Sequence, residues 1–232
     1  MIGTFVTFEG VDFSGKTTQR KLLAEKLRAA GYDVVETREP GGTPYAEQIR
    51  ELILRNKKTG DDEVIHPITE LLLFQAARAQ HVRNVIKPAL EAGKIVLCDR
   101  FVMSTFAYQV WPHTSEADGT LMDLFYGSTP FVTGVLQREP VTFFFDLPKE
   151  ERLKRKLARG DEINHFDERE DEFFAKVDEA FDQLKHSNMV MTIDANRSRE
   201  VITDELFNVL VNYMKQVEEV VKKAEAKTNE QQ

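Results

Sequence analysis

The segment from Gly10 to Thr17 constrains the fold of this chain more than any other feature of its sequence. It reads Gly-Val-Asp-Phe-Ser-Gly-Lys-Thr and fits the pattern G-x-x-x-x-G-K-[ST]. The apolar run Ile2 to Phe8 precedes it, and a helical pattern begins at Lys16. Glycines in such a loop let backbone N–H groups approach phosphate oxygens, and the helix N-terminus adds positive potential. The segment therefore predicts a strand–loop–helix unit that binds phosphate.

Side chains within this loop suggest individual roles in binding a nucleoside triphosphate such as ATP. Lys16 can reach the β- and γ-phosphates, and the Thr17 hydroxyl is placed to coordinate Mg²⁺. Asp12 needs a separate reason, because a carboxylate repels phosphate. It is either a turn-forming residue or an acceptor for a sugar hydroxyl of a second substrate. The candidate ATP-binding residues are Gly10, Val11, Asp12, Phe13, Ser14, Gly15, Lys16, Thr17 and Thr18.

Short apolar runs alternate with helical patterns along the chain. The expected strands are Ile2 to Phe8, Val34 to Thr37, Ile95 to Cys98, Val141 to Phe145 and Met189 to Ile193. The expected helices are Lys16 to Ala30, Tyr45 to Leu54, Pro67 to Ala92, Glu150 to Arg159, Asp167 to Lys185 and Arg199 to Lys223. A kink or break is expected at Pro88. This alternation predicts an α/β fold of three layers, α/β/α, with a five-stranded parallel sheet.

The same reading gives one domain, residues 1–216, and a polar tail, residues 217–232, that we expect to fray. Three stretches look irregular: Lys57 to Glu63, Trp111 to Gly119 and Gly160 to Phe166. The third separates two helices, so we expect a small helical lid over about residues 150–170 that closes over the site.

Composition narrows the classes of partner and compartment. The 232 residues are 41% apolar and 30% charged, which is typical of a globular protein. The net charge of −8 argues against a duplex-DNA partner. The chain has neither an apolar run of about 18 residues nor a signal-like start, which argues against a membrane partner and secretion. The lone cysteine, Cys98, excludes an intramolecular disulfide and favours a reducing, cytoplasmic location.

A second motif follows the third expected strand. The apolar run Ile95 to Cys98 ends in Asp99, which suits the carboxylate that partners Mg²⁺ beside a phosphate-binding loop. Arg100 comes next and can hold a phosphoryl group through two parallel hydrogen bonds. Thr17 and Asp99 are therefore the candidate metal ligands.

Together these motifs resemble the thymidylate kinase family, within the nucleoside-monophosphate kinases. The resemblance runs from about residue 2 to residue 215. It is carried by Phe8-Glu9-Gly10, the run Thr37-Arg38-Glu39-Pro40-Gly41-Gly42-Thr43, Leu73-Phe74 with Ala77 to Val82, Asp99-Arg100-Phe101, and Ser104 to Gln109. It implies a five-stranded parallel sheet, a mobile lid and a homodimer. It also implies an enzyme that catalyses ATP + dTMP → ADP + dTDP with Mg²⁺, a step in dTTP synthesis.

The resemblance also implies roles for individual residues on the acceptor side. Phe74 would stack on thymine, and Arg78, one helical turn later, would donate to a base carbonyl. Arg100 would hold the monophosphate, with Arg38 nearby. Without the family match, Phe74 and Tyr108 would be interpreted as core packing.

The remaining acceptor residues follow from the same motifs. Ser104 and Thr105 would line the base pocket, Pro40 would help to wall it, and Gln109 would lie near the thymine or sugar. Tyr108 would crowd the sugar 2′ position and so favour deoxyribose. The 3′-hydroxyl would go to Asp12, which accounts for a carboxylate inside the loop.

The chain departs from the family pattern where an arginine should neutralise the transferred phosphate. The loop position that can supply this arginine holds Phe13, and the lid alternative reads Asn164-His165-Phe166-Asp167, with His165 in the arginine's place. Our hypothesis is that Arg159, helped by Arg155, neutralises the phosphate when the lid closes. The alternative is that these arginines only hold their helix. The candidate catalytic residues are Lys16, Arg100, Arg159 and Arg155.

Two other functions remain open. Val110 to Thr114 is bulkier than the Gly-rich stretch common in the family, so the acceptor could be dUMP or another deoxynucleoside monophosphate. A GTPase switch would need an Asn-Lys-x-Asp motif, and the nearest string, Asn56 to Thr59, lacks the aspartate. For a kinase, we expect in-line transfer without a covalent intermediate. A homodimer would use the apolar faces of Pro67 to Ala92 and Met103 to Tyr108.

Overall fold

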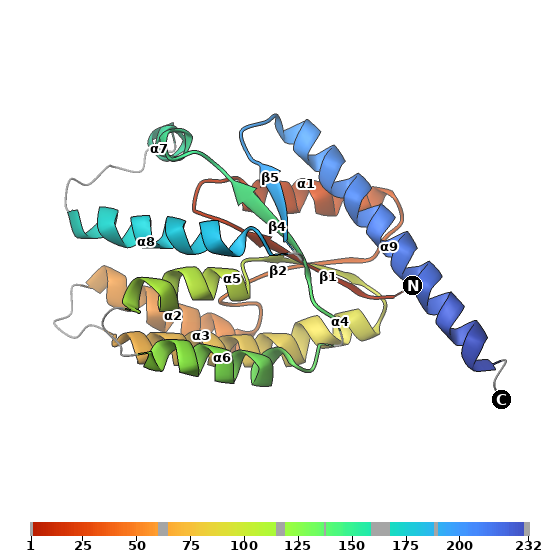
Figure 1. Cartoon of the computed structure of the whole chain (residues 1–232), viewed down its shortest axis with the longest axis horizontal. Helices are drawn as coiled ribbons and strands as arrows, with labels where there is room; N and C mark the ends of the chain where they lie inside the picture. Colours follow the sequence, from red (N-terminus) through yellow and green to blue (C-terminus); the bar gives the residue numbers. More distant parts are fainter. Residues whose placement is uncertain are drawn as a thin grey trace.

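A computed structural model describes residues 2–59, 65–114, 119–136, 138–158, 168–187 and 190–229. Its sheet has five strands, all paired in parallel, in the order β2-β3-β1-β4-β5. The strands are β1 (Thr4–Glu9), β2 (Val34–Arg38), β3 (Ile95–Asp99), β4 (Val141–Asp146) and β5 (Val190–Asp194). The predicted α/β class with a five-stranded parallel sheet is confirmed, and helices cover both faces of the sheet (Figure 1).

The α-helices of the described residues lie between and after these strands. They are α1 (Lys16–Ala29), α2 (Pro44–Thr59), α3 (Pro67–His81), α4 (Lys87–Glu91), α5 (Val102–Thr105), α6 (Thr120–Thr133), α7 (Lys149–Ala158), α8 (Glu168–Leu184) and α9 (Arg199–Asn229). The string Asn56 to Thr59, which the GTPase interpretation would have used, lies at the end of α2 and not after a strand. None of the helices described here is long and apolar enough to cross a membrane.

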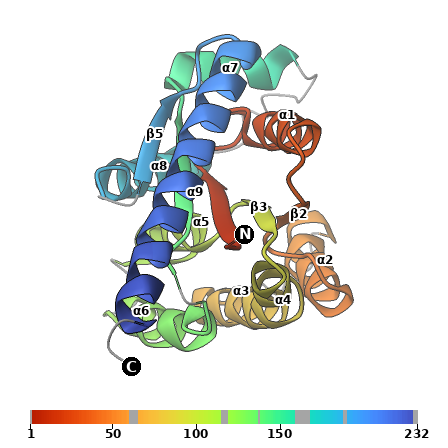
Figure 2. The same cartoon turned by 90° about the vertical axis from the view of Figure 1, so that its right-hand side faces the viewer.

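The strands send their side chains to both faces of the sheet because successive residues point to opposite sides, and three apolar clusters form among the described residues. Val6 and Phe8 of β1 belong to the core beneath α1 and α9, where Leu23 and Leu206 pack. Phe5 of β1 lies in a separate core with residues of α4. By this alternation Glu9 belongs to the same face as Phe5, the face covered by α3, α5 and α6 (Figures 1 and 2).

The long helix predicted over Pro67 to Ala92 forms in three pieces. A π-helical turn, Val82–Ile86, separates α3 from α4. Pro88 lies in the first turn of α4, where its missing N–H and its ring conflict with regular α-helical bonding to the preceding turn. The wider π turn takes up this conflict, so the expected kink at Pro88 is replaced by a local change of helix type upstream.

Two helical segments differ from the sequence-based expectations. Helix α6 was not predicted, because Gly127 and Pro130 oppose helix formation locally. It forms because Leu121 and Phe125, four residues apart, pack into the core on Phe106. Helix α9 continues past its predicted end at Lys223 to Asn229, within the expected tail, and its far end projects beyond the sheet in Figure 1. Glutamate and lysine four residues apart favour helix there.

Parts of the expected irregular stretches lie outside the described residues. The expected lid segment Gly160 to Phe166, with Arg159 and His165, is one of them. Of Trp111 to Gly119, the structure describes a 3₁₀ turn at Trp111–His113, together with Thr114 and Gly119. Of Lys57 to Glu63, the first three residues complete α2.

Candidate active site

The phosphate-binding loop lies at the carboxyl end of β1, where β3 and β4 flank it on either side. Gly10 adopts φ +124°, and a Cβ there would lie 2.7 Å from the carbonyl oxygen of Phe145 on β4. Gly15 adopts φ +98° immediately before α1. Both positions therefore require glycine, because a side chain would be strained at this φ and would clash at Gly10. The loop therefore has the tight backbone that the sequence predicts for an anion-binding turn.

Lys16 is folded back onto this loop. Its Nζ donates to the Val11 carbonyl at 2.6 Å and to Ser14 Oγ at 3.3 Å. The side chain is buried, and this burial lowers the pKa of Lys16 to about 7, with the charge of Arg100 adding to the shift. A phosphate bound in the loop would favour the charged form, so Lys16 suits an anionic ligand.

Thr17, in the first turn of α1, meets Asp99 at the end of the neighbouring strand β3. Thr17 Oγ1 donates to Asp99 Oδ2 at 2.5 Å. A hydroxyl and a carboxylate are hard oxygen donors of the kind that Mg²⁺ prefers, so the pair fits the predicted metal site. Thr18 follows in the first turn of α1 and is half-buried.

Arg100 joins the end of β3 to the loop. Its guanidinium donates to the Gly10 carbonyl at 3.2 Å, to Ser104 Oγ at 2.9 Å and to Asp12 Oδ1 at 2.6 Å. Burial alone would lower the pKa of Arg100, but Tyr108 and Asp12 raise it overall. Burial alone would raise the pKa of Asp12, but Arg100 and Lys16 hold it below its usual range. Asp12 and Arg100 are therefore both charged and paired.

Glu9 was not identified as a site residue from the sequence. It ends β1 and is buried, and one carboxylate oxygen accepts from the Phe101 backbone N–H at 2.7 Å. The other oxygen accepts from Ser104 Oγ. Burial raises the pKa of Glu9, although the Ser104 hydrogen bond and the Arg100 charge act in the opposite direction. A single charge at the end of an apolar strand was the available signal.

Two arginines flank the loop after β2 at the same edge of the sheet: Arg38 is the last residue of β2, and Arg50 belongs to α2. Arg38 donates to Glu47 Oε2 at 2.8 Å, and the second carboxylate oxygen accepts from the Gly42 N–H at 2.9 Å. Arg50, one turn further along α2, donates to the Pro40 carbonyl at 3.1 Å. Burial lowers the pKa of Arg50, and the positive charges of Arg38 and Arg100 lower it further. Sequence analysis missed Arg50 because an arginine on a helix is usually a surface residue.

Arg78 is the largest fully buried side chain of the described residues. It donates to Glu39 at 2.8 Å, to the Gln75 side chain at 2.9 Å, and through Nη2 to the Phe101 carbonyl and Thr105 Oγ1. These bonds use four of the five N–H donors of a guanidinium. Arg78 and Thr105 are therefore fixed side by side, next to the backbone that follows Arg100.

His81 completes this buried network. Its Nδ1 hydrogen-bonds to Glu39 Oε1 at 2.9 Å, and its Nε2 hydrogen-bonds to Thr37 Oγ1 at 2.6 Å. Glu39 precedes Pro40 through a cis peptide bond. The network thus connects α3 to the loop that carries Arg38.

The expected base-side residues lie near these groups. Phe74 is half-buried and belongs to none of the three core clusters. The Tyr108 ring lies 5.1 Å from Arg100 Cζ, and burial raises the pKa of Tyr108. Its buried hydroxyl has no hydrogen-bond partner within the described part of the chain. Gln109 Nε2 lies 3.4 Å from Glu70 Oε1.

The bulky segment after Gln109 packs on Phe106 and on α8. Trp111 lies on the Phe106 ring with centroids 5.8 Å apart, and its Nε1 donates to Glu179 of α8 at 3.3 Å. The Lys176 ammonium donates to the Pro112 carbonyl at 3.3 Å. The segment is therefore joined to α8.

Arg155 on α7 lies against the phosphate-binding loop. Its Nη1 is 3.5 Å from the Phe13 carbonyl oxygen and 3.4 Å from that of Ser14, and its Nη2 donates to the Ala195 carbonyl at 2.8 Å. Arg152 anchors α7 to α8 through two hydrogen bonds to Asp178, at 2.7 and 3.0 Å. Arg159, which the hypothesis places on the transferred phosphate, and His165, which stands in the place of the lid arginine, lie outside the described residues.

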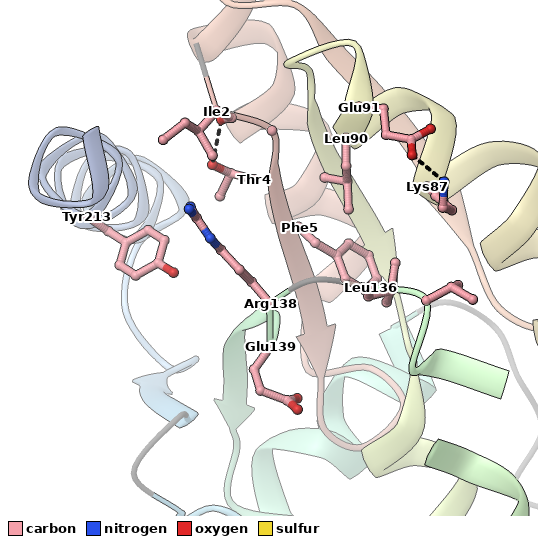
Figure 3. Close-up of a pocket in the computed structure, with 12 residues that line it drawn as sticks. Ile2, Thr4, Phe5, Lys87, Leu90, Glu91, Leu136, Arg138, Glu139 and Tyr213 are labelled. Atoms are coloured by element: carbon pink, nitrogen blue, oxygen red, sulfur yellow. Dashed lines mark hydrogen bonds and ion pairs between the residues drawn. The ribbon is translucent and has the colours of Figure 1, made fainter. Parts of the chain in front are cut away.

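A separate cavity lies at the opposite edge of the sheet, where β1 begins (Figure 3). Phe5, Leu90 and Leu136 form its apolar part, and Lys87 pairs with Glu91 at its rim. Ligands of open α/β sheets bind at the carboxyl ends of the strands. The candidate active site is therefore the edge that carries the phosphate-binding loop.

Comparison with known proteins agrees with this geometry. The family model described as Thymidylate kinase matches residues 8–206. A thymidylate kinase of Pseudomonas fluorescens (strain Pf0-1) is 50% identical over 181 residues, which cover 78% of this chain and 81% of that protein. One from Exiguobacterium sibiricum is 40% identical over 220 residues, covering 94% and 99%.

A solved structure also resembles the fold. The crystal structure of thymidylate kinase from Ehrlichia chaffeensis superposes with a TM-score of 0.65 at 33% identity, covering 90% of this chain and 99% of that chain. The match of the family model to most of the chain, together with these relatives, establishes that the chain belongs to the thymidylate kinase family.

Proposed function

We propose that this enzyme transfers the γ-phosphoryl group of ATP to dTMP, giving ADP and dTDP. The observation that supports this most directly is the position of Arg100, whose guanidinium contacts both Gly10 and Asp12 of the phosphate-binding loop. An arginine there can hold an acceptor phosphate directly beside the donor phosphates. Its place supports a phosphorylated acceptor over a free nucleoside.

On the donor side, the loop amides and Lys16 would bind the phosphates of ATP. Lys16 would exchange its contacts with the Val11 carbonyl and Ser14 for phosphate oxygens. Thr17 and Asp99 would hold Mg²⁺, which when bound neutralises charge on the β- and γ-phosphates. Arg155 would keep the loop carbonyls of Phe13 and Ser14 engaged while the N–H groups face the ligand.

On the acceptor side, three arginines would surround the dTMP phosphate: Arg100, Arg38 and Arg50. Burial lowers the pKa of Arg50, and the positive charges of Arg38 and Arg100 lower it further, so the three guanidinium groups lie close enough to repel one another. A dianionic phosphate would relieve this repulsion. The free oxygen of the Asp12 carboxylate would accept the sugar 3′-hydroxyl, since the other oxygen accepts from Arg100.

The base would lie between Phe74 and the buried Arg78 network. The remaining N–H of Arg78 would donate to a base carbonyl, with Ser104 and Thr105 beneath and Pro40 as a wall. Tyr108 would crowd the sugar 2′ position, and Gln109 would lie near the thymine or sugar. A buried arginine fixed by four hydrogen bonds would read the base with little loss of side-chain entropy on binding.

Transfer would be direct and in line, because a phosphate oxygen is already anionic and needs no strong general base. Arg159 of the lid, helped by Arg155, would neutralise charge on the transferred group. We further propose a single domain over residues 1–216 with a lid near 150–170, a homodimer, and action in the cytoplasm on nucleotides, without a nucleic-acid or membrane partner.

The test is ADP formation from ATP and Mg²⁺ against dTMP, dUMP, UMP, dCMP, dGMP and thymidine. We expect kcat/KM to be highest for dTMP. Preference for dUMP would keep the phosphoryl-transfer chemistry but overturn the roles given to Arg78 and Tyr108. ADP formation independent of every acceptor would overturn the proposal.

A further inference from the structure

Arg100 is held in a backbone conformation that residues other than glycine rarely adopt. Its φ is +68°, in the left-handed region. The bend comes directly after β3, and the side chain then contacts Gly10 and Asp12 across the end of β1. The Arg100 N–H donates to the Phe8 carbonyl at 3.0 Å. Such a conformation persists only where the surrounding structure fixes it.

Glu9 contacts this bend on two sides. One carboxylate oxygen accepts from the backbone N–H of Phe101, at 2.7 Å, immediately after Arg100. The other accepts from Ser104 Oγ, which in turn accepts from Arg100 Nη1 at 2.9 Å. Glu9 is 1% exposed. One buried carboxylate therefore bonds to the main chain that follows Arg100 and, through Ser104, to its guanidinium.

A buried carboxylate is costly unless its hydrogen bonds return the lost solvation. At this position on β1, a leucine or valine would fill space without that cost. We infer that Glu9 is a positioning residue for the acceptor phosphate: it fixes the Arg100 turn so that the guanidinium meets the phosphate at the end of the donor loop. Glu9 touches neither nucleotide and acts through Arg100. The inference rests on the proposed dTMP kinase activity.

The test compares Glu9→Gln with the wild-type enzyme. Glutamine keeps the shape and one acceptor oxygen but removes the charge that strengthens both hydrogen bonds. We expect KM for dTMP to rise by about tenfold or more, while KM for ATP changes less than about twofold. A role confined to stability would lower the melting temperature and leave both KM values of the folded enzyme unchanged.

Thr7→Val is the matched control. Thr7 lies on the same strand and the same face, and its buried hydroxyl is bonded to Thr142 Oγ1 at 2.9 Å. Valine there removes a buried hydrogen bond without touching Arg100. We expect a lower melting temperature with KM for dTMP within about twofold of wild type. A rise in this control equal to that of Glu9→Gln would overturn the inference.

A mutant cycle with Arg100→Ala tests whether Glu9 acts through Arg100. If it does, Glu9→Gln adds little to the loss in kcat/KM for dTMP that Arg100→Ala already causes. Additive losses would overturn the inference. If Glu9→Gln does not fold, Glu9→Asp takes its place in the same cycle with the same two outcomes, because the shorter side chain withdraws the carboxylate from the Phe101 N–H and from Ser104 Oγ. Absence of dTMP phosphorylation by wild type would refute the proposed function itself, whereas an active wild type with unchanged KM in Glu9→Gln refutes only this inference.

Discussion

Lys16 combines burial with a function that requires charge. Its pKa of about 7 in the unliganded protein means that roughly nine in ten molecules carry a neutral Lys16 at pH 8, and roughly one in ten at pH 6. Bound phosphate favours the ammonium. We therefore expect ATP binding to take up close to one proton at Lys16 at pH 8 and almost none at pH 6. Calorimetric titrations in buffers of different ionisation enthalpy measure this uptake.

Lys16→Arg is the control for this proton uptake, because a guanidinium stays charged across the same pH range. Subtracting its titration from that of wild type removes the protons that ATP itself exchanges. Equal uptake by the two proteins at pH 8 would contradict a lowered Lys16 pKa.

Arg50, which the sequence patterns did not reveal, allows the proposed binding of the dTMP phosphate to be tested with a single side chain. Arg50→Ala removes one charged donor from the proposed phosphate site, so we expect KM for dTMP to rise about 10- to 100-fold with little change in KM for ATP. Arg28→Ala is the matched control. Arg28 is likewise a helix arginine: it pairs with Glu36 at 2.8 Å and donates to the carbonyl of Val34, the first residue of β2, at the opposite end of the strands. Steady-state kinetics with each substrate varied decides, and unchanged KM for dTMP in Arg50→Ala would remove it from the site.

At the scale of elements, the phosphate-binding loop can approach β4 closely only because Gly10 has no side chain. Gly10→Ala would place Cβ 2.7 Å from the Phe145 carbonyl oxygen, at φ +124°. We expect it to lower the free energy of unfolding by about 2 kcal/mol or more and to abolish ATP binding. In Gly127→Ala, within α6, the new methyl group meets nothing within 4 Å. Alanine there should stabilise the protein by about 0.5–1 kcal/mol. Urea unfolding of both variants measures the contrast, and equal effects would contradict it.

Helix α7 tests whether the lid arginines act in catalysis. Arg155→Ala should lower kcat by about 100-fold while the Kd for ATP changes only several-fold, because the charge develops in the transition state. Lys154→Ala, on the same helix and paired only with Glu151 among the described residues, should leave kcat within about twofold. Single-turnover kinetics separates the chemical step from product release. An unchanged rate in Arg155→Ala would leave the role to Arg159 or to neither.

These elements also show what the sequence could and could not predict. The loop from Gly10 to Thr17 is readable because phosphate binding demands glycine and lysine at fixed spacing. Helix α6 cannot be predicted in this way, because Gly127 and Pro130 oppose helix formation locally. The helix is stabilised instead by tertiary packing, with Phe125 on Phe106. Glu9 and Arg50 were missed for a related reason, because a single charged residue produces no periodic pattern in the sequence. Their hydrogen-bond partners are also hard to foresee: Glu9 accepts from Phe101, which is distant in the chain, and Arg50 donates to Pro40, which lies in a loop.

At the scale of the whole molecule, the outer surface of α3 and α6 bears on the proposed homodimer. Leu72 on α3 is 48% exposed, and on α6 Tyr126 is 60% and Phe131 is 80% exposed. The two helices lie beside each other in both views (Figures 1 and 2). Large apolar side chains left in water on adjacent helices are typical of a contact surface. A stable interface needs about 800 Å² from each partner, which two neighbouring helices can supply.

We therefore expect the wild-type protein to be a dimer in sedimentation equilibrium and the double variant Leu72→Glu with Phe131→Glu to be a monomer, because buried unpaired carboxylates would oppose association. Val220→Glu is the control, since Val220 is an equally exposed apolar residue, 66%, but lies on the outer part of α9. It should remain a dimer. If Val220→Glu dissociates the protein and the double variant does not, the contact surface is α9. Because Phe106 packs against both Phe125 and Tyr126 of α6 and shares a helical segment with Tyr108, dissociation should also raise KM for dTMP.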